Sequence, residues 1–217
     1  MGGRNRRQRS QSPSGRSSSP RAKQTDARAS QAGSVFVCRE IPRPASVALA
    51  VRPDGWERLD LTFSVGAPPP GISADVFRSA VQRALAIWTQ AVPFRFTEGT
   101  NGGTLTVAGV AAHHEDGFDF PPNTPELAHG FGPVTGGGTL DGQVHLNNAK
   151  TWADGSSADG DILTVVLHEL GHALGIIEHF GDDHTVMNAT FPPGLIRRVL
   201  TAADIAAMRG LYAAQLS

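Results

Sequence analysis

Residues 162–174 read ILTVVLHELGHAL, and the fold of the whole chain follows most directly from this stretch. Asp161 before it suits the N-cap of a helix, and Gly175 after it suits the left-handed residue that ends one, so we predict a helix between them. Residues four apart lie on one helical face, so the imidazoles of His168 and His172 can reach one cation. The stretch therefore predicts a metal site on one face of a helix.

Glu169 stands between the two histidines, about 100° around the helix from His168. At that angle its carboxylate approaches the water beside the cation instead of the cation itself. Zinc bound by imidazole with one open position lowers the pKa of its water towards about 7, and a neighbouring carboxylate can accept the proton. The pattern predicts zinc-dependent peptide hydrolysis; the alternative is a pair of core or surface histidines with an unrelated Glu.

The composition fits one domain of ordinary size with metal sites. The chain has 217 residues, 40% of them hydrophobic, and all of its histidines lie between His113 and His184. No apolar run approaches the roughly 18 residues that cross a bilayer, so we expect no membrane span. A single cysteine excludes an internal disulfide and a zinc site made of cysteines alone.

Residues 1–34 form a basic arm, rich in Arg and Ser, that differs from the rest of the chain. Asp26 is its only acid, and it has too few apolar residues to form a core, so we expect it to be disordered. No apolar segment follows its basic residues before Val35, so no secretory signal peptide is visible. A solvated tail is the simpler interpretation, and we do not expect nucleic acid as a partner; a nucleic-acid-binding arm would show salt-sensitive binding.

The rest of the chain predicts one domain of mixed α and β structure. Residues 58–65 alternate apolar and polar side chains as in a half-buried strand, and Ser73 caps a helix that ends before Pro93. Thr201 and Asp204 suit a capping box. The remaining predicted elements are short strands at 94–97 and 104–108 and a helix at about 202–213. Residues 111–148, rich in Gly, Pro and His, form too long a loop for a compact domain unless something fastens it.

The chain resembles the matrixins, the matrix metalloproteinase branch of the metzincin zinc peptidases, from about Cys38 to Leu211. After HExxH come Gly175, His179 and Met187, similar to the metzincin motif HExxHxxGxxH and its later Met-turn. The segments that resemble the first strand, the first helix and the last helix of these catalytic domains are WERLDLTF (56–63), AVQRALAIWTQAVPFRFTE (80–98) and TAADIAAMRGLY (201–212). The resemblance implies an α+β catalytic domain over 51–217. We expect a twisted five-stranded mixed sheet, mainly parallel with an antiparallel edge strand, three helices, and a zinc cleft at the HExxH helix.

The resemblance also implies a third ligand of the catalytic zinc. Counting from His168, the family spacing places it at Glu178, whereas the histidine is one residue later, at His179. We favour His179, because its separation from Met187 agrees with the family and imidazole suits zinc, while Glu178 stays open as a carboxylate ligand. Met187 would pack beneath the metal ligands.

A second, structural zinc is implied in the histidine-rich loop and would provide the fastening that this loop needs. The implied ligands are His114, Asp116, His129 and His145. The alternative is a set of unliganded loop histidines. The family also implies calcium in this segment, but Asn147 and Lys150 stand at positions that are acidic in the family, and an ammonium group has no lone pair to offer a cation. We therefore do not expect calcium.

Further residues are assigned by the resemblance to substrate binding and latency. Leu127 and Ala128 lie in the strand that resembles the substrate-binding edge, and Phe191 stands where the family has an aromatic pocket wall; packing under a loop is the alternative for Phe191. Cys38, within a linker at 35–50, resembles a cysteine switch whose thiolate blocks the open position of the zinc; the alternative is an ordinary free thiol.

The sequence as a whole predicts a zinc metalloendopeptidase that acts on proteins or peptides, with Glu169 as general base. The alternative is a catalytically inactive zinc-binding scaffold with a basic interaction arm. We expect a monomer. The resemblance implies a secreted, extracellular protein, although the sequence leaves the compartment, the physiological substrate and the mode of activation open.

Overall fold

A computed structural model describes residues 35–39, 55–100, 102–133 and 138–217. The predicted arm, residues 1–34, and residues 40–50 of the predicted linker lie outside the described residues. The parts that are described and that carry the site belong to one compact unit, within residues 32–217.

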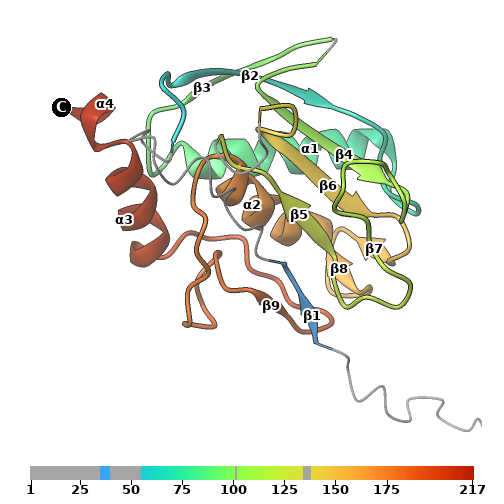
Figure 1. The fold of residues 1–217 in the computed structure, drawn as a ribbon. Coiled ribbons are helices and arrows are strands. Elements are labelled where there is room, and N and C mark those ends of the chain that lie inside the picture. Colours follow the sequence, from blue (N-terminus) through green and yellow to red (C-terminus); the bar gives the residue numbers. More distant parts are fainter. Residues whose placement is uncertain (1–34, 40–54, 101, 134–137) are drawn as a thin grey trace, which may run out of the picture. The chain divides into compact units, whose positions relative to one another are not determined.

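Five strands form the main sheet, in the order β3-β2-β4-β6-β5 (Figure 1). Their bounds are β2 Asp60–Val65, β3 Arg95–Glu98, β4 Leu105–Val110, β5 Ala128–Gly130 and β6 Gln143–Asn147. β2 pairs in parallel with β3 and β4, β4 pairs in parallel with β6, and β5 pairs with β6 antiparallel. The predicted mixed sheet with an antiparallel edge strand is confirmed, and β5 is that edge.

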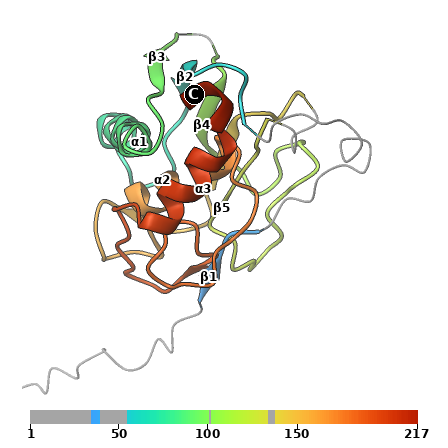
Figure 2. The ribbon, with the colours of Figure 1, turned by 90° about the vertical axis from the view of Figure 1, so that its left-hand side faces the viewer.

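Two long helices pack beneath the sheet and a third lies beside them (Figures 1 and 2). They are α1 Ala74–Trp88, α2 Ile162–Ala173 and α3 Ala202–Leu211. The predicted caps are present: Ser73, Asp161 and Thr201 each accept a hydrogen bond from the backbone three residues later, and Asp204 completes the capping box. The predicted third helix is interrupted at Tyr212, and a short helix, α4 Ala213–Leu216, follows.

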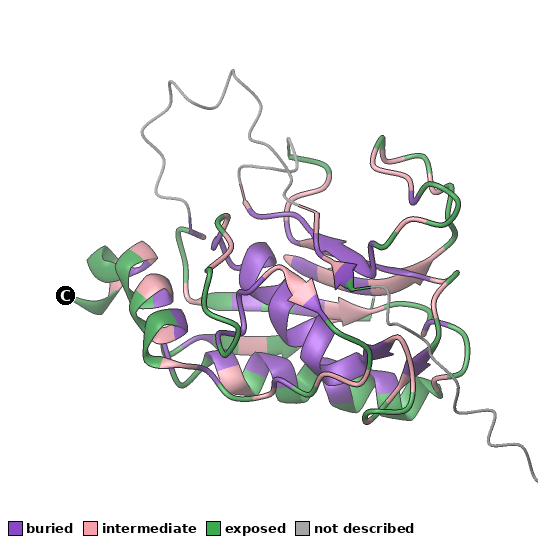
Figure 3. Cartoon of the chain, turned by 90° about the horizontal axis from the view of Figure 1, so that it is seen from below, coloured by how far each residue is buried: buried purple, intermediate pink, exposed green. Residues whose placement is uncertain are grey.

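The core lies between the sheet and helices α1 and α2. Every residue of α2 is buried, and Figure 3 shows this helix buried along its length while α3 exposes much of its surface. Two glycines permit the close packing: a Cβ on Gly130 of β5 would lie 2.5 Å from the Glu169 carbonyl oxygen, and one on Gly171 would lie 2.4 Å from Met187 Sδ. α2 is thereby held between the edge strand and Met187.

Short strands complete the fold. β7 Trp152–Ala153 pairs in parallel with β8 Gly160–Asp161, and β1 Phe36–Val37 pairs antiparallel with β9 Thr190–Phe191. β1 joins elements far from it in the sequence, because Val37 also bridges Glu126 just before β5. Among the described helices, none is long and apolar enough to cross a membrane.

Candidate metal centre and active site

Three histidines converge on one side of α2. His168 and His172 project from adjacent turns of the helix, and His179 comes from the chain that follows Gly175. The Nε2 atom of His172 lies 3.1 Å from Nε2 of His168 and 3.2 Å from Nε2 of His179. Gly175 has φ +117°, a left-handed value that ends the helix and turns the chain back towards it.

The hydrogen bonds of the other ring nitrogens determine which nitrogen of each imidazole carries the proton. Nδ1 of His168 donates to the Val186 carbonyl oxygen at 2.7 Å, and Nδ1 of His172 donates to the Ile176 carbonyl oxygen at 2.6 Å. Each Nε2 of this pair therefore carries a lone pair instead of a proton. Burial lowers the pKa of both histidines, that of His172 to about 3, so both imidazoles stay neutral at pH 7.

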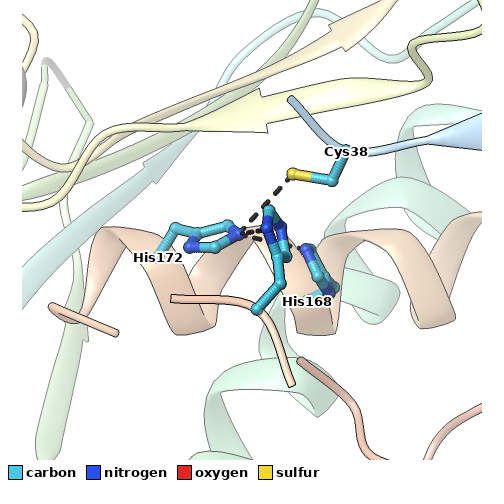
Figure 4. Close-up of side chains that lie close together, drawn as sticks. Cys38, His168 and His172 are labelled. Atoms are coloured by element: carbon cyan, nitrogen blue, oxygen red, sulfur yellow. Dashed lines mark hydrogen bonds between the residues drawn. The ribbon is translucent and has the colours of Figure 1, made fainter. Parts of the chain in front are cut away.

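Cys38 completes a four-residue donor set with the three histidines, and the ligand atoms all lie within 4.8 Å of one another. Its Sγ lies 3.5 Å from His172 Nε2 and 3.6 Å from Glu169 Oε2. Figure 4 shows Cys38 pointing from the end of β1 towards His168 and His172. Burial, with the Glu169 carboxylate, raises the pKa of the Cys38 thiol, so the thiolate form needs a cation beside it.

These separations fit tetrahedral zinc. Zinc–nitrogen bonds of about 2.0–2.1 Å place neighbouring nitrogen ligands about 3.3 Å apart, and a zinc–sulfur bond of about 2.3 Å places sulfur about 3.6 Å from those nitrogens. The three distances from His172 Nε2 to the other donors, 3.1 Å to His168, 3.2 Å to His179 and 3.5 Å to Cys38, agree. Lone pairs that face one another so closely are stable only around a cation, so the arrangement has the chemistry of a metal site.

Glu169 lies beside this donor set and is 1% exposed. Its Oε1 is buried without a hydrogen-bond partner among the described residues, while Oε2 faces the Cys38 sulfur. Burial raises the pKa of its carboxyl to about 8. A buried carboxyl with a raised pKa next to a metal site has the properties of a group that exchanges protons during a reaction.

A second donor cluster fastens the histidine-rich loop to the sheet. It consists of His114, Asp116, His129 on β5 and His145 on β6. Asp116 Oδ2 lies 2.9 Å from His114 Nε2, 2.9 Å from His145 Nδ1 and 3.6 Å from His129 Nε2. One carboxylate and three imidazoles within this distance of one another match the ligand types of a closed zinc site.

The outer nitrogens of this second cluster are also held. His114 Nδ1 donates to the Ala111 carbonyl oxygen at 3.0 Å, His129 Nδ1 to Glu126 Oε1 at 3.0 Å, and His145 Nε2 to Gln143 Oε1 at 2.9 Å. Burial lowers the pKa of His145 to about 4, which keeps this ring neutral at pH 7. The inner nitrogen of His145 is therefore free of a proton, and the inner nitrogens of all three rings face Asp116 as ligand atoms do.

The residues predicted to bind substrate lie at the edge strand and beside His168. Leu127 and Ala128 are buried at the edge strand, and the Leu127 N–H donates to the Val37 carbonyl oxygen at 3.3 Å. The ring of Phe191 lies 5.0 Å from the ring of His168, edge to face. Met187 is fully buried and packs beneath Gly171 of the HExxH helix.

Comparison with known families decides the assignment of the chain. The family profile described as Matrixin matches residues 55–213, which cover the sheet, the three long helices and both histidine clusters. The chain belongs to the matrixin family. The matrixins are zinc metalloendopeptidases, and the α+β fold expected of them is the fold described above.

Individual matrixins are moderately similar to this chain. Matrix metalloproteinase-20 of Homo sapiens is 31% identical over 152 residues, which are 70% of this chain and 30% of that protein. Matrilysin of Homo sapiens is 31% identical over 176 residues, 79% of this chain and 64% of that protein. Karilysin of Tannerella forsythia is 28% identical over 159 residues, 72% of this chain and 33% of that protein. The chain thus spans from about a third to just under two thirds of the length of these relatives.

Several residues considered in the sequence lie away from the matrixin site or have other partners. Glu178 is exposed and is not among the clustered donors, whereas His179 is. Asn147 donates to the Glu126 carbonyl oxygen at 3.1 Å, and the Lys150 ammonium contacts the Thr124 carbonyl oxygen. His113 contacts the Asp119 carboxylate and lies outside both clusters.

Sequence reasoning missed the groups that orient the ligands. Val186 and Ile176 act through backbone carbonyls, which no side-chain pattern reveals. Glu126, 3% exposed, carries a carboxylate that sequence reasoning did not single out, although a charged residue directly before an apolar strand edge was a usable signal.

Proposed function

We propose that this chain is a zinc-dependent endopeptidase that hydrolyses internal peptide bonds of protein substrates. The observation that carries this is the convergence of His168, His172 and His179 beside the buried carboxylate of Glu169. These three histidines would hold the catalytic zinc. His114, Asp116, His129 and His145 would hold a structural zinc. We propose no calcium site.

Each residue around the centre would have its own role in the reaction. Zinc held there would supply a lowered pKa for bound water and polarise the substrate carbonyl. Glu169 would accept a proton from the attacking water and later donate it to the leaving amine nitrogen. The edge at Leu127 and Ala128 would hold the substrate backbone by hydrogen bonds, and Phe191 would form one wall of an apolar pocket beside it. Met187 would support the ligands from below.

We also propose that Cys38 keeps the enzyme latent. Its Sγ lies 3.6 Å from Glu169 Oε2, so it would take the position from which water acts. The segment is held there on both sides, because Val37 N donates to the Pro125 carbonyl oxygen at 3.1 Å and Cys38 N donates to the Ala189 carbonyl oxygen at 2.9 Å. Displacement or removal of this segment would open the site.

An inactive zinc-binding scaffold is the competing proposal. This proposal requires that the third ligand cannot reach the metal, because His179 comes one residue later than the family spacing places it. The 3.2 Å separation between His179 Nε2 and His172 Nε2 argues against that, because it matches the spacing of two ligands on one zinc ion. From the family we propose that the protein is extracellular and monomeric and that it acts on proteins.

The Glu169→Ala substitution tests the proposed activity. In a full-length Cys38→Ser background we expect cleavage of an unstructured fluorogenic peptide, and we expect Glu169→Ala to lower kcat/KM at least about hundredfold. Zinc content should stay at two ions per chain, measured by atomic emission, because Glu169 is not a ligand. Glu98→Ala on β3 is the control and should change neither quantity. Absence of cleavage by the zinc-loaded Cys38→Ser chain, or full activity of Glu169→Ala, would contradict the proposal.

A further inference from the structure

The segment around Cys38 lies between β9 and the chain just before β5 as an extended peptide held by its backbone. Besides the hydrogen bonds of Val37 and Cys38, Leu127 N donates to the Val37 carbonyl oxygen at 3.3 Å, and Phe36 pairs with Phe191 across β1 and β9. Backbone hydrogen bonds of this kind do not depend on side chains. The side chains of the segment therefore show which groups of the domain lie within reach of a peptide bound at this edge.

The side chain of Arg39 enters a site formed by two residues of the domain. Its Nη2 donates to the Phe118 carbonyl oxygen at 3.0 Å, and its Nε lies 3.4 Å from Glu126 Oε1. The guanidinium carbon also lies 5.8 Å from the centre of the Phe118 ring. A carboxylate, a carbonyl oxygen and an aromatic face together are the groups that bind a guanidinium best.

The two sides of this ion pair are unequally buried. The Glu126 side chain is 4% exposed, whereas the Arg39 side chain is 40% exposed. The carboxylate is built into the wall of the cleft next to Leu127, and the cation comes from the segment that the proposed function requires to leave. His129 Nδ1 also donates to Glu126 Oε1, and this hydrogen bond holds the carboxylate in place. A buried carboxylate that loses its cation is destabilised, so the wall favours another cation in the same position.

We propose that Glu126 and Phe118 form a specificity subsite for a basic side chain of the substrate, and that Arg39 occupies this subsite in the latent chain. This inference rests on the proposed peptidase function and names its substrate class: peptides with Arg, or less favourably Lys, close to the scissile bond. A planar guanidinium can contact the Glu126 carboxylate and the Phe118 carbonyl oxygen together and stack on the ring, which an ammonium group cannot do equally well. An acidic side chain would meet the charge of Glu126 and be disfavoured.

The first test measures occupancy of the subsite without any peptidase activity. Cys38 is the only cysteine, so the rate at which iodoacetamide alkylates the zinc-loaded full-length chain reports how often the segment leaves the cleft. We expect Arg39→Ala to raise this rate about tenfold, the value of its hydrogen bond to the Phe118 carbonyl oxygen together with its ion pair to Glu126. Glu126→Gln removes only the ion pair and should raise the rate less, and the double variant should raise it no further than Arg39→Ala alone. The exposed pair of Arg78 and Glu98 on α1 and β3 provides the matched controls, Arg78→Ala and Glu98→Gln, which should not change the rate.

Two features keep this measurement interpretable. Loss of Arg39 removes a positive charge next to Cys38, and a positive charge favours the thiolate that iodoacetamide attacks, so charge alone would slow alkylation and a faster rate reports release of the segment. Zinc content is measured for Glu126→Gln, because Glu126 contacts His129; Gln keeps an oxygen that can accept the His129 hydrogen bond. An unchanged rate in Arg39→Ala would overturn the proposal.

The second test measures recognition of the substrate. Glu169→Ala is combined with Cys38→Ser and Arg39→Ala in the full-length chain, so the subsite is empty and peptides are bound but not cleaved. Peptides with Arg at successive positions around the scissile bond are compared by fluorescence anisotropy with peptides carrying citrulline, which has the same shape without the charge. We expect about tenfold tighter binding of one Arg peptide, lost in Glu126→Gln and kept in Glu98→Gln. Equal binding of every Arg and citrulline pair would overturn the subsite, whether or not the enzyme proves active.

Discussion

At the scale of single residues, the choice between His179 and Glu178 shows what a one-residue shift does. Counting along the sequence favours Glu178 as third ligand, but the turn after Gly175 brings His179 into the donor cluster and leaves Glu178 exposed. We expect His179→Ala to lower the zinc content from two ions per chain to one after dialysis against a weak chelator, and Glu178→Ala to keep both. His172→Ala serves as the reference for a lost ligand. Zinc loss in Glu178→Ala but not in His179→Ala would reverse the assignment.

Tyr212, the only tyrosine of the chain, permits a prediction about alkaline pH. Its hydroxyl accepts from Trp56 N at 3.0 Å and donates to the Leu174 carbonyl oxygen at 2.7 Å, and burial raises its pKa above the usual value of about 10. The folded state keeps a proton that the unfolded state loses, so the free energy of unfolding is unaffected by this group below pH 10 and falls as pH rises further.

We therefore expect tyrosinate absorbance to appear together with the loss of near-ultraviolet circular dichroism during an alkaline titration. Tyr212→Phe is the control: it removes the signal and, because it leaves the buried Leu174 carbonyl oxygen and the partly buried Trp56 N–H without this partner, lowers the free energy of unfolding by about 1–3 kcal/mol. Tyrosinate absorbance near pH 10 in a chain that is still folded would contradict the prediction.

At the scale of elements, α2 depends on the absence of a side chain at Gly171. Alanine is normally better than glycine inside a helix by about 1 kcal/mol. Here the new Cβ would lie 2.4 Å from Met187 Sδ and 2.8 Å from Trp88 Cζ2, and overpacking in a core costs about 1–3 kcal/mol. We expect steric overlap to outweigh helix propensity, so Gly171→Ala lowers the midpoint of urea unfolding. Gly210→Ala in α3, where a Cβ meets nothing within 4 Å, should raise it. A raised midpoint in Gly171→Ala would mean that Met187 and Trp88 move aside freely.

The helix boundaries could be predicted from the sequence because their signals are local. Asp161, Thr201 and Asp204 each satisfy backbone groups within three residues, so the sequence contains the whole interaction. Asp204 also accepts hydrogen bonds from Val186 N at 3.0 Å and Met187 N at 3.2 Å, and this tie to the turn beneath the metal site has no local signal. The HExxH pair was predictable because its two histidines are also close in the sequence. The carbonyl partners of its imidazoles and the site around Glu126 were not predictable. Contacts of that kind depend on how distant segments pack.

At the scale of the whole molecule, the second cluster joins the histidine-rich loop to two strands of the sheet. His114 and Asp116 come from the loop, and His129 and His145 from β5 and β6. A metal ion that binds only the folded state stabilises that state by about 2.7 kcal/mol when the free metal concentration is a hundred times the dissociation constant. We expect chelation to lower the Tm and to direct limited proteolysis to residues 111–124. Asp116→Asn, analysed by mass spectrometry of the fragments, should be cut there even in zinc. The same fragment pattern with and without chelator would contradict a structural role for this metal.

The position of β1 between β9 and the edge strand has a consequence for how the proposed latency ends. The segment that carries Cys38 is joined to the domain by residues 40–54, so under the proposed latency it would act at the high effective concentration of a tethered ligand, which reaches the millimolar range for short tethers. A single cut anywhere in that tether converts the occupant into a separate peptide that dilutes into the solvent. A substrate then does not need to bind more tightly than the tethered segment. Each molecule activated in this way would cut residues 40–54 of other molecules, so activation would accelerate as it proceeds.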